Sequence, residues 1–68
     1  GDPLAGLSER ERVLVDLLGS ARTLGEISGE MGVSYRTAAA MAARVRGKLG
    51  LRTNTALVKF AVEQRGEV

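Results

Sequence analysis

The residues of this sequence that are best suited to chemistry are basic, and they gather in one short stretch. From position 36 to position 52 the chain carries five basic residues and no acid. These are Arg36, Arg44, Arg46, Lys48 and Arg52. Charge is also uneven along the whole chain, because residues 1–34 have a net charge of −3 and residues 35–68 one of +5. A positive field concentrated on one element predicts a polyanion as its partner.

Catalytic and metal-binding chemistry finds little support in the composition. The chain has no cysteine for a thiolate or a disulfide, and no histidine for metal ligation or proton transfer near neutral pH. No nucleophile and base pair stands out, and neither does a cluster of metal ligands. We therefore expect no enzyme activity, no metal and no cofactor.

A length of 68 residues limits the chain to one small domain with a modest core. No apolar run approaches the roughly 20 residues that span a bilayer, and no signal segment opens the chain. We expect a cytoplasmic protein without membrane contact. The opening residues 1–6, GDPLAG, lack periodicity, so we expect a flexible linker or a cloning remnant there and a folded domain over residues 7–68.

Helix start and stop signals follow one another along the chain and would position the basic stretch. The N-cap candidates are Ser8, Thr23, Ser34, and Thr53 or Asn54. The stop signals are Gly32, Gly50 and Gly66. No segment alternates apolar and polar residues as a strand would. The sequence predicts an all-α fold, a bundle of four helices over about 9–19, 24–31, 35–49 and 54–65.

The third of these helices has two distinct faces when its residues are placed at intervals of 100°. A core-facing stripe is predicted for Ala38, Met41, Ala42, Val45 and Leu49. The opposite side is small in its middle and basic at its ends, and it comprises Arg36, Ala40, Ala43, Arg44 and Gly47. The helix is therefore expected to pack through one face and to present the other to a partner.

The second helix is short, and Gly25 and Gly29 lie inside it. Each costs on the order of 1 kcal/mol relative to alanine, so we expect another helix to approach closely there. Residues 32–34 then form a turn that leads into the long basic helix. Two helices joined in this way are typical of a helix-turn-helix, whose second helix lies in the major groove of DNA.

Four short motifs occur in order and without a gap: LSERE at residues 7–11, TLGEIS at 23–28, SYRTA at 34–38 and VRGKLGLR at 45–52. They resemble L-T-x-R-E, S-N-K-E-I-A, S-x-x-T-V and I-x-x-K-L-G-V-x of the LuxR-type helix-turn-helix domain, also called the FixJ/NarL or GerE type. The resemblance runs from residue 7 to residue 68. Several spaced motifs in the correct order are far more specific than one.

The resemblance implies the C-terminal DNA-binding domain of a bacterial transcriptional regulator of the response-regulator kind. Double-stranded DNA is the implied partner, bound by a homodimer on a two-fold site, and RNA polymerase is a further candidate partner. An upstream receiver or ligand-binding domain, which this chain lacks, is implied as well. Family dimers commonly meet through the last helix, which would use Val58, Lys59 and Val62. The alternative is that the two valines are isolated surface apolar residues.

Individual roles follow from the motif matches. Thr37 matches the threonine of S-x-x-T, where a hydroxyl and free amides suit a phosphate oxygen; the alternative is a second cap or a buried hydrogen bond back to the helix backbone. Lys48 matches the lysine of K-L-G and Arg36 a commonly basic position, so both are expected at phosphates or a groove edge, with solvated charge as the alternative. Arg44 and Arg46 are expected to contact the DNA backbone. Glu11 is interpreted as structural, paired with a basic residue of the third helix.

The sequence departs from the family where side chains usually meet base edges. Family members commonly carry polar residues there, whereas this chain has Ala39, Ala40 and Ala43. Alanine offers only apolar contact to a thymine methyl. Specificity is then expected from residues at the rim, from DNA shape and dimer spacing, or from a partner that supports weak binding. The rim residues are Tyr35, Arg36 and Arg44.

The same alanines support a second hypothesis from another class of function. Small residues permit a partner helix to approach closely. A degenerate helix-turn-helix would then act as a protein interaction module with weak or no specific DNA binding.

Overall fold

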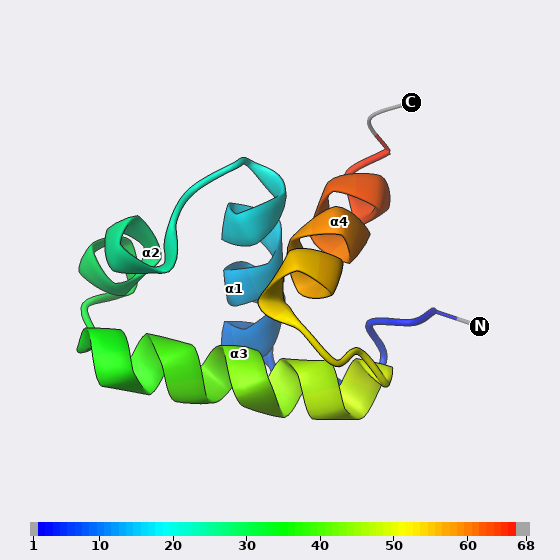
Figure 1. Cartoon of the computed structure of the whole chain (residues 1–68), viewed down its shortest axis with the longest axis horizontal. Helices are drawn as coiled ribbons and strands as arrows, with labels where there is room; N and C mark the ends of the chain where they lie inside the picture. The colour runs from blue at the N-terminus through cyan, green and yellow to red at the C-terminus, as the bar shows by residue number, and fades with distance from the viewer. Residues whose placement is uncertain (1, 67–68) are drawn as a thin grey trace.

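Four α-helices make up the computed structural model, which describes residues 2–66 (Figure 1). They are α1 (Glu9–Gly19), α2 (Leu24–Met31), α3 (Tyr35–Leu49) and α4 (Asn54–Gln64). No strand occurs among the described residues. The predicted all-α fold with four helices is confirmed, and α4 ends one residue before the predicted boundary at 65. Residues 1, 67 and 68 of the predicted domains lie outside the described part.

Hydrogen bonds at the helix starts explain where α1 and α2 begin. The Ser8 Oγ accepts from the Glu11 N–H at 3.1 Å, and the Glu11 Oε1 accepts from the Ser8 N–H at 2.8 Å. Thr23 and Glu26 form a second capping box with the same two distances. Each box satisfies two backbone amides that a helix start otherwise leaves without an intrahelical partner. Local sequence therefore sets these boundaries.

The two ends of α3 are also set locally. The Thr37 N–H donates to the Ser34 Oγ at 3.1 Å, which caps the first turn. Gly50 has a φ of 72° and closes the helix in the left-handed conformation that glycine tolerates best. Gly32, with a φ of 70°, ends α2 in the same way. The short segment between Gly32 and Ser34 joins α2 to α3 as the predicted helix-turn-helix (Figure 1).

The core lies where α1 meets the other three helices. The largest fully buried side chains come one from each helix: Leu14, Ile27, Val45 and Leu57. Both α1 and α3 contact all the other helices. Figure 1 shows α3 along one edge of the molecule, with the remaining helices on the same side of it. One long side of α3 is thus left uncovered by any other helix.

Close helix approach occurs at Gly19 and not at the two glycines of α2. A Cβ added to Gly19 would lie 2.7 Å from the carbonyl oxygen of Ala61 and 2.7 Å from the Cδ of Arg65. For Gly25 the nearest atom would be 3.8 Å away, and for Gly29 no atom lies within 4 Å. The expectation of close packing at Gly25 and Gly29 is therefore wrong, because both positions face solvent.

The segment before α1 turns back onto the domain. The Leu4 N–H donates to the Asp2 Oδ1 at 2.9 Å, and the Asp2 carboxylate lies 3.7 Å from the Arg12 guanidinium. The half-buried Leu4 side chain packs against the core. The expectation of a flexible linker over residues 1–6 does not describe Leu4, which contacts the core. Its apolar side chain gains free energy by leaving water for the core surface.

None of the helices within residues 2–66 has the length and the apolar character that a membrane crossing requires.

Candidate nucleic-acid interface

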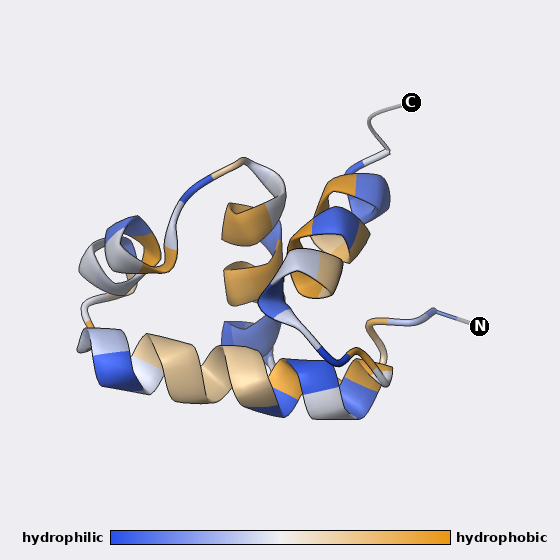
Figure 2. Cartoon of the chain, in the orientation of Figure 1, coloured by the Kyte–Doolittle hydropathy of each residue, from blue (hydrophilic) through white to orange (hydrophobic). Residues whose placement is uncertain are grey.

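The inward stripe of α3 is the one that the helical spacing predicts. Ala38, Ala42 and Val45 are buried, and Met41 and Leu49 are half-buried against the core. Two of the five alanines therefore serve packing, since their short side chains let α3 lie close to its neighbours. Figure 2 shows α3 along its length, with an apolar middle between ends that carry hydrophilic residues.

The opposite side of α3 is solvent-exposed, and we refer to it as the outer face. It consists of Arg36, Ala40, Ala43, Arg44 and Gly47, all of them exposed. Ala39, a predicted base-reading position, is half-buried at the edge of this face. The middle of the outer face therefore carries no hydrogen-bonding side chain, and its polar chemistry is at its two arginines.

Of the four basic residues of α3, these two arginines are the ones without a partner among residues 2–66. Within residues 2–66, Arg36 and Arg44 form no ion pair with any acid. Arg46 donates instead to the Asn54 Oδ1 at the start of α4, and Lys48 is paired with Glu11 of α1. The guanidiniums of the outer face are consequently available to an outside anion, for which a planar fork of donors suits phosphate and guanine edges alike.

Lys48 differs from the arginines in its surroundings. Its Nζ lies 2.8 Å from the Glu11 Oε1 and donates to the Gly6 carbonyl oxygen at 3.3 Å. The Lys48 ammonium, followed by the Ser8 backbone N–H, holds the pKa of Glu11 below its usual value against the opposing effect of burial. The interpretation of Glu11 as a structural residue paired with α3 is confirmed, and the basic partner is Lys48.

The start of α3 presents three further polar groups. Tyr35 is the first helical residue and is 58% exposed, so its hydroxyl reaches solvent. The exposed Thr37 hydroxyl accepts from the Ser34 Oγ at 3.0 Å. Both the predicted phosphate contact and the alternative cap role fit this geometry, because a hydroxyl that accepts one hydrogen bond still has a proton to donate.

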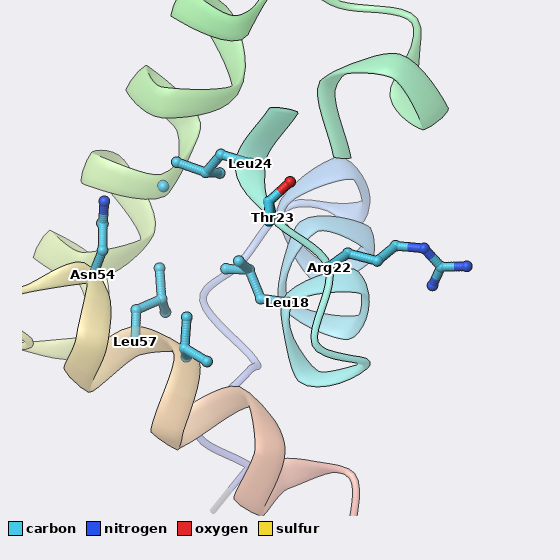
Figure 3. A pocket seen from close by; sticks show the side chains of 8 residues that line it. Leu18, Arg22, Thr23, Leu24, Asn54 and Leu57 are labelled. Carbon is cyan, nitrogen blue, oxygen red and sulfur yellow. The ribbon is translucent and has the colours of Figure 1, made fainter. Parts of the chain in front are cut away.

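The predicted dimer residues occupy one side of α4, although not equally. Val58 is 37% exposed and Lys59 is exposed, whereas Val62 is half-buried. The expectation that Val62 is exposed is corrected in this respect, since part of its side chain is covered. Val58 also borders a mainly apolar recess of about 110 Å³ among the four helices (Figure 3). Figure 3 shows Leu18, Leu24 and Leu57 at this recess and the Arg22 side chain pointing away from it.

Some features of the interface were not predicted from the sequence. Arg52, which follows α3, is exposed and has no ion pair within residues 2–66, so it adds to the free positive charge. The basic run at residues 36–52 contained the signal for it. The contact between Lys48 and the Gly6 carbonyl has no signal in the sequence, since 42 positions separate the two residues. Among the residues described, no three acids gather where they could hold a metal ion.

Comparisons with known proteins agree with this geometry, although no family model matches the chain. The chain is 36% identical over 62 residues to the DNA-binding transcriptional activator DevR/DosR of Mycobacterium tuberculosis, which covers 91% of the chain and 29% of that protein. It is 36% identical over 61 residues to the transcriptional regulatory protein TdiR of Thauera aromatica, covering 90% and 27%. The chain thus spans less than a third of either relative's length. With the four-helix arrangement, these matches identify the chain as a helix-turn-helix domain similar to a segment of these two transcriptional regulators.

Proposed function

We propose that the chain is the DNA-binding domain of a transcriptional regulator and that the outer face of α3 enters the major groove of double-stranded DNA. The observation that carries this proposal is the pair Arg36 and Arg44, which are exposed, unpaired within residues 2–66 and accompanied by no acid on α3. One relative is named a DNA-binding transcriptional activator and the other a transcriptional regulatory protein, which supports the same function.

The dimensions of the outer face suit a groove. Arg44 lies eight positions after Arg36, which corresponds to about 12 Å along the helix axis. The major groove is about 12 Å wide and admits an α-helix, so the two arginines can contact the DNA at two points while the small middle lies against the base edges. Tyr35 and Thr37 at the helix start, and Arg52 beyond its end, extend the surface that faces phosphates.

Base recognition is expected to be sparse in this arrangement. Ala39, Ala40 and Ala43 contribute no hydrogen bond, so we propose that Tyr35, Arg36 and Arg44 supply the direct contacts, with DNA shape providing the rest of the discrimination. Each guanidinium has five donors, so each arginine contacts a phosphate as well as a base edge. Lys48, the remaining predicted contact, is treated separately below because of its ion pair with Glu11.

Binding as a homodimer through α4 is part of the proposal. Val58 and Lys59 are exposed side chains of α4, and the partly covered Val62 lies one turn further along. Two copies joined there would place two α3 helices on a two-fold site, with half-sites one helical turn of DNA apart.

Sedimentation velocity tests this dimer on a duplex with two half-sites. The unchanged chain should bind as two copies. For Val58→Asp we expect the cooperativity between the two bound copies to be lost. Cooperativity that is equal in both proteins would argue against α4 as the interface.

A second function is favoured by one observation, the small and apolar middle of the outer face. In that alternative α3 accepts a helix of a protein partner and binds DNA weakly or not at all. Chemical-shift mapping with a duplex separates the two functions. DNA binding predicts shifts concentrated on residues 35–47 with smaller changes on the far side of α1. Unchanged spectra at low salt, together with shifts of the same residues on addition of a protein partner, would replace the first function with the second.

A further inference from the structure

We propose that Lys48 supports DNA binding as a positioning residue, holding α3 against the start of α1 through Glu11, and not as a phosphate contact. This inference rests on the proposed function for its effect on affinity, although its structural part can be tested without DNA. It assigns Lys48 a role different from the phosphate contact that the family motif suggests.

Glu11 is a specific anchor for this purpose. It is the one charged side chain that is buried among the described residues, with 4% of its surface exposed. Its Oε1 accepts from the Ser8 N–H at 2.8 Å and from the Lys48 ammonium, also at 2.8 Å. The first hydrogen bond fixes the carboxylate to the N-terminus of α1, and the second connects that fixed point to the last turn of α3. The lowered pKa of Glu11 is consistent with a carboxylate held in its charged form.

The Lys48 ammonium is already occupied on the protein side. Besides Glu11 it donates to the Gly6 carbonyl oxygen, at 3.3 Å. Two of its three donors are thus engaged, and turning them to a phosphate would leave the buried Glu11 carboxylate without its countercharge, which costs more than an exposed ion pair returns. Binding of Arg36 or Arg44 to a phosphate has no such cost, because neither has an internal ion pair within residues 2–66. Lys48 is thus better suited to holding the helix than to holding the DNA.

Lys48 lies in the last turn of α3, so its contact with Glu11 affects the orientation of the whole helix, including Arg36 at the other end. Twelve residues separate it from Arg36, which is about 18 Å along the helix axis. A tilt of α3 by about 10° about this end would displace Arg36 by about 3 Å, a full hydrogen-bond length. Loss of the Glu11 contact is therefore expected to misplace the arginines relative to a groove even while the domain stays folded.

The test compares three changes in duplex titrations at several salt concentrations. Lys48→Arg keeps a cation for Glu11 and should retain the affinity of the unchanged chain. Glu11→Gln combined with Lys48→Met removes both charges, so no buried charge is left unpaired. We expect this double variant to bind all duplexes about tenfold more weakly, as misplacement of one charge-assisted contact would give, and to make a further Arg36→Gln change nearly without effect, because the Arg36 contact is already lost. In the unchanged chain, Arg36→Gln should lower the salt slope by about 0.9 for a lost phosphate contact.

Affinities are compared only where circular dichroism shows the double variant to be fully folded, so that a loss of folded protein does not mimic a loss of positioning. Losses of affinity that add when the double variant is combined with Arg36→Gln would overturn the proposal in favour of an independent phosphate contact by Lys48. An unchanged affinity of the folded double variant would overturn it as well.

An orientation measurement without DNA separates this inference from the proposed function. Residual dipolar couplings of backbone amides report the angle between α1 and α3. We expect that angle to change in the double variant and to be retained in Lys48→Arg. An unchanged angle in the double variant would refute the positioning role. If the unchanged chain binds no duplex but the angle responds as expected, the proposed function fails while the role of Lys48 in placing α3 stands.

Discussion

At the scale of single residues, the outer face of α3 has two arginines that can bind an anion and a middle that cannot form hydrogen bonds. Arg36 and Arg44 are free of internal ion pairs within residues 2–66, whereas Arg46 and Lys48 on the same helix are engaged by neighbouring elements. A cation that already has a partner inside the fold must give up that contact before it can bind an outside anion. Fewer basic residues of α3 are therefore available to bind DNA than the sequence of the helix suggests.

Ala40→Asn tests the small middle of the outer face. Asparagine can bind the N6 and N7 edges of adenine at once, and a good pair of this kind is worth about 1–3 kcal/mol of discrimination. We expect the variant to gain a preference of at least about fivefold for duplexes with adenine at one central position, at a stability cost of about 0.5 kcal/mol. Competition titrations over duplexes that differ at one base pair measure this preference.

Ala5→Asn, which changes an exposed alanine in the segment before α1, is the matched control and should leave all preferences unaltered. Identical preferences for Ala40→Asn and the unchanged chain would mean that the middle of α3 does not face the bases.

The face on which each α3 residue lies could be predicted from the sequence, because helical spacing alone determines it. The internal partners of the basic residues could not. Lys48 meets Glu11 across 37 positions and Gly6 across 42, and both contacts depend on how α1 and α3 pack. A charge pattern in sequence shows where cations are, whereas only the tertiary structure shows which of them remain unpaired.

At the scale of elements, the helix boundaries follow local rules and the helix contacts do not. Ser8, Thr23, Ser34 and Thr53 each accept a backbone N–H at a helix start, so the caps could be assigned from sequence. Which glycines lie at a helix contact could not be predicted from the sequence. The same residue type stands at exposed positions of α2 and at the buried contact of α1 with α4, and no local signal distinguishes the two.

Paired glycine substitutions test this assignment. Gly19→Ala would place a methyl group 2.7 Å from the Ala61 carbonyl oxygen, so we expect α1 and α4 to move apart and stability to fall by about 1–3 kcal/mol. Gly29→Ala meets open space inside α2 and should stabilise the domain by up to about 1 kcal/mol. Urea unfolding of both variants measures the difference. Equal effects of the two substitutions would contradict the contact at Gly19.

At the scale of the whole molecule, charge and shape act together. The acids are concentrated in the first half of the sequence, while α3 lies along one edge with its outer face uncovered (Figure 1). The uneven charge was visible in the sequence, but the exposure of one complete side of α3 depends on all three other helices lying on its opposite side. That arrangement turns a basic stretch into a candidate binding surface.

The ion pair between the buried Glu11 and the exposed Lys48 joins two helices, so it should appear in the pH dependence of global stability. Because the pKa of Glu11 is lower in the folded chain than the ordinary 4.5, the charged carboxylate favours the fold. That stabilisation is fully present above pH 4.5 and is lost as the pH falls through the folded pKa. Urea unfolding between pH 7 and pH 3 should show a smaller decline for Glu11→Gln than for the unchanged chain. Equal declines would show that the pair contributes nothing to acid sensitivity.

The central claim, that the outer face of α3 binds the DNA backbone, is tested most directly by the salt dependence of duplex binding. The logarithm of the affinity should fall linearly with the logarithm of the salt concentration, and Arg36→Gln combined with Arg44→Gln should lower the slope by about 1.8, about 0.9 for each phosphate contact. Arg10→Gln, which removes an exposed cation from α1, should leave the slope unchanged. No salt-dependent binding at low ionic strength, or an equal fall in slope for Arg10→Gln, would contradict the claim.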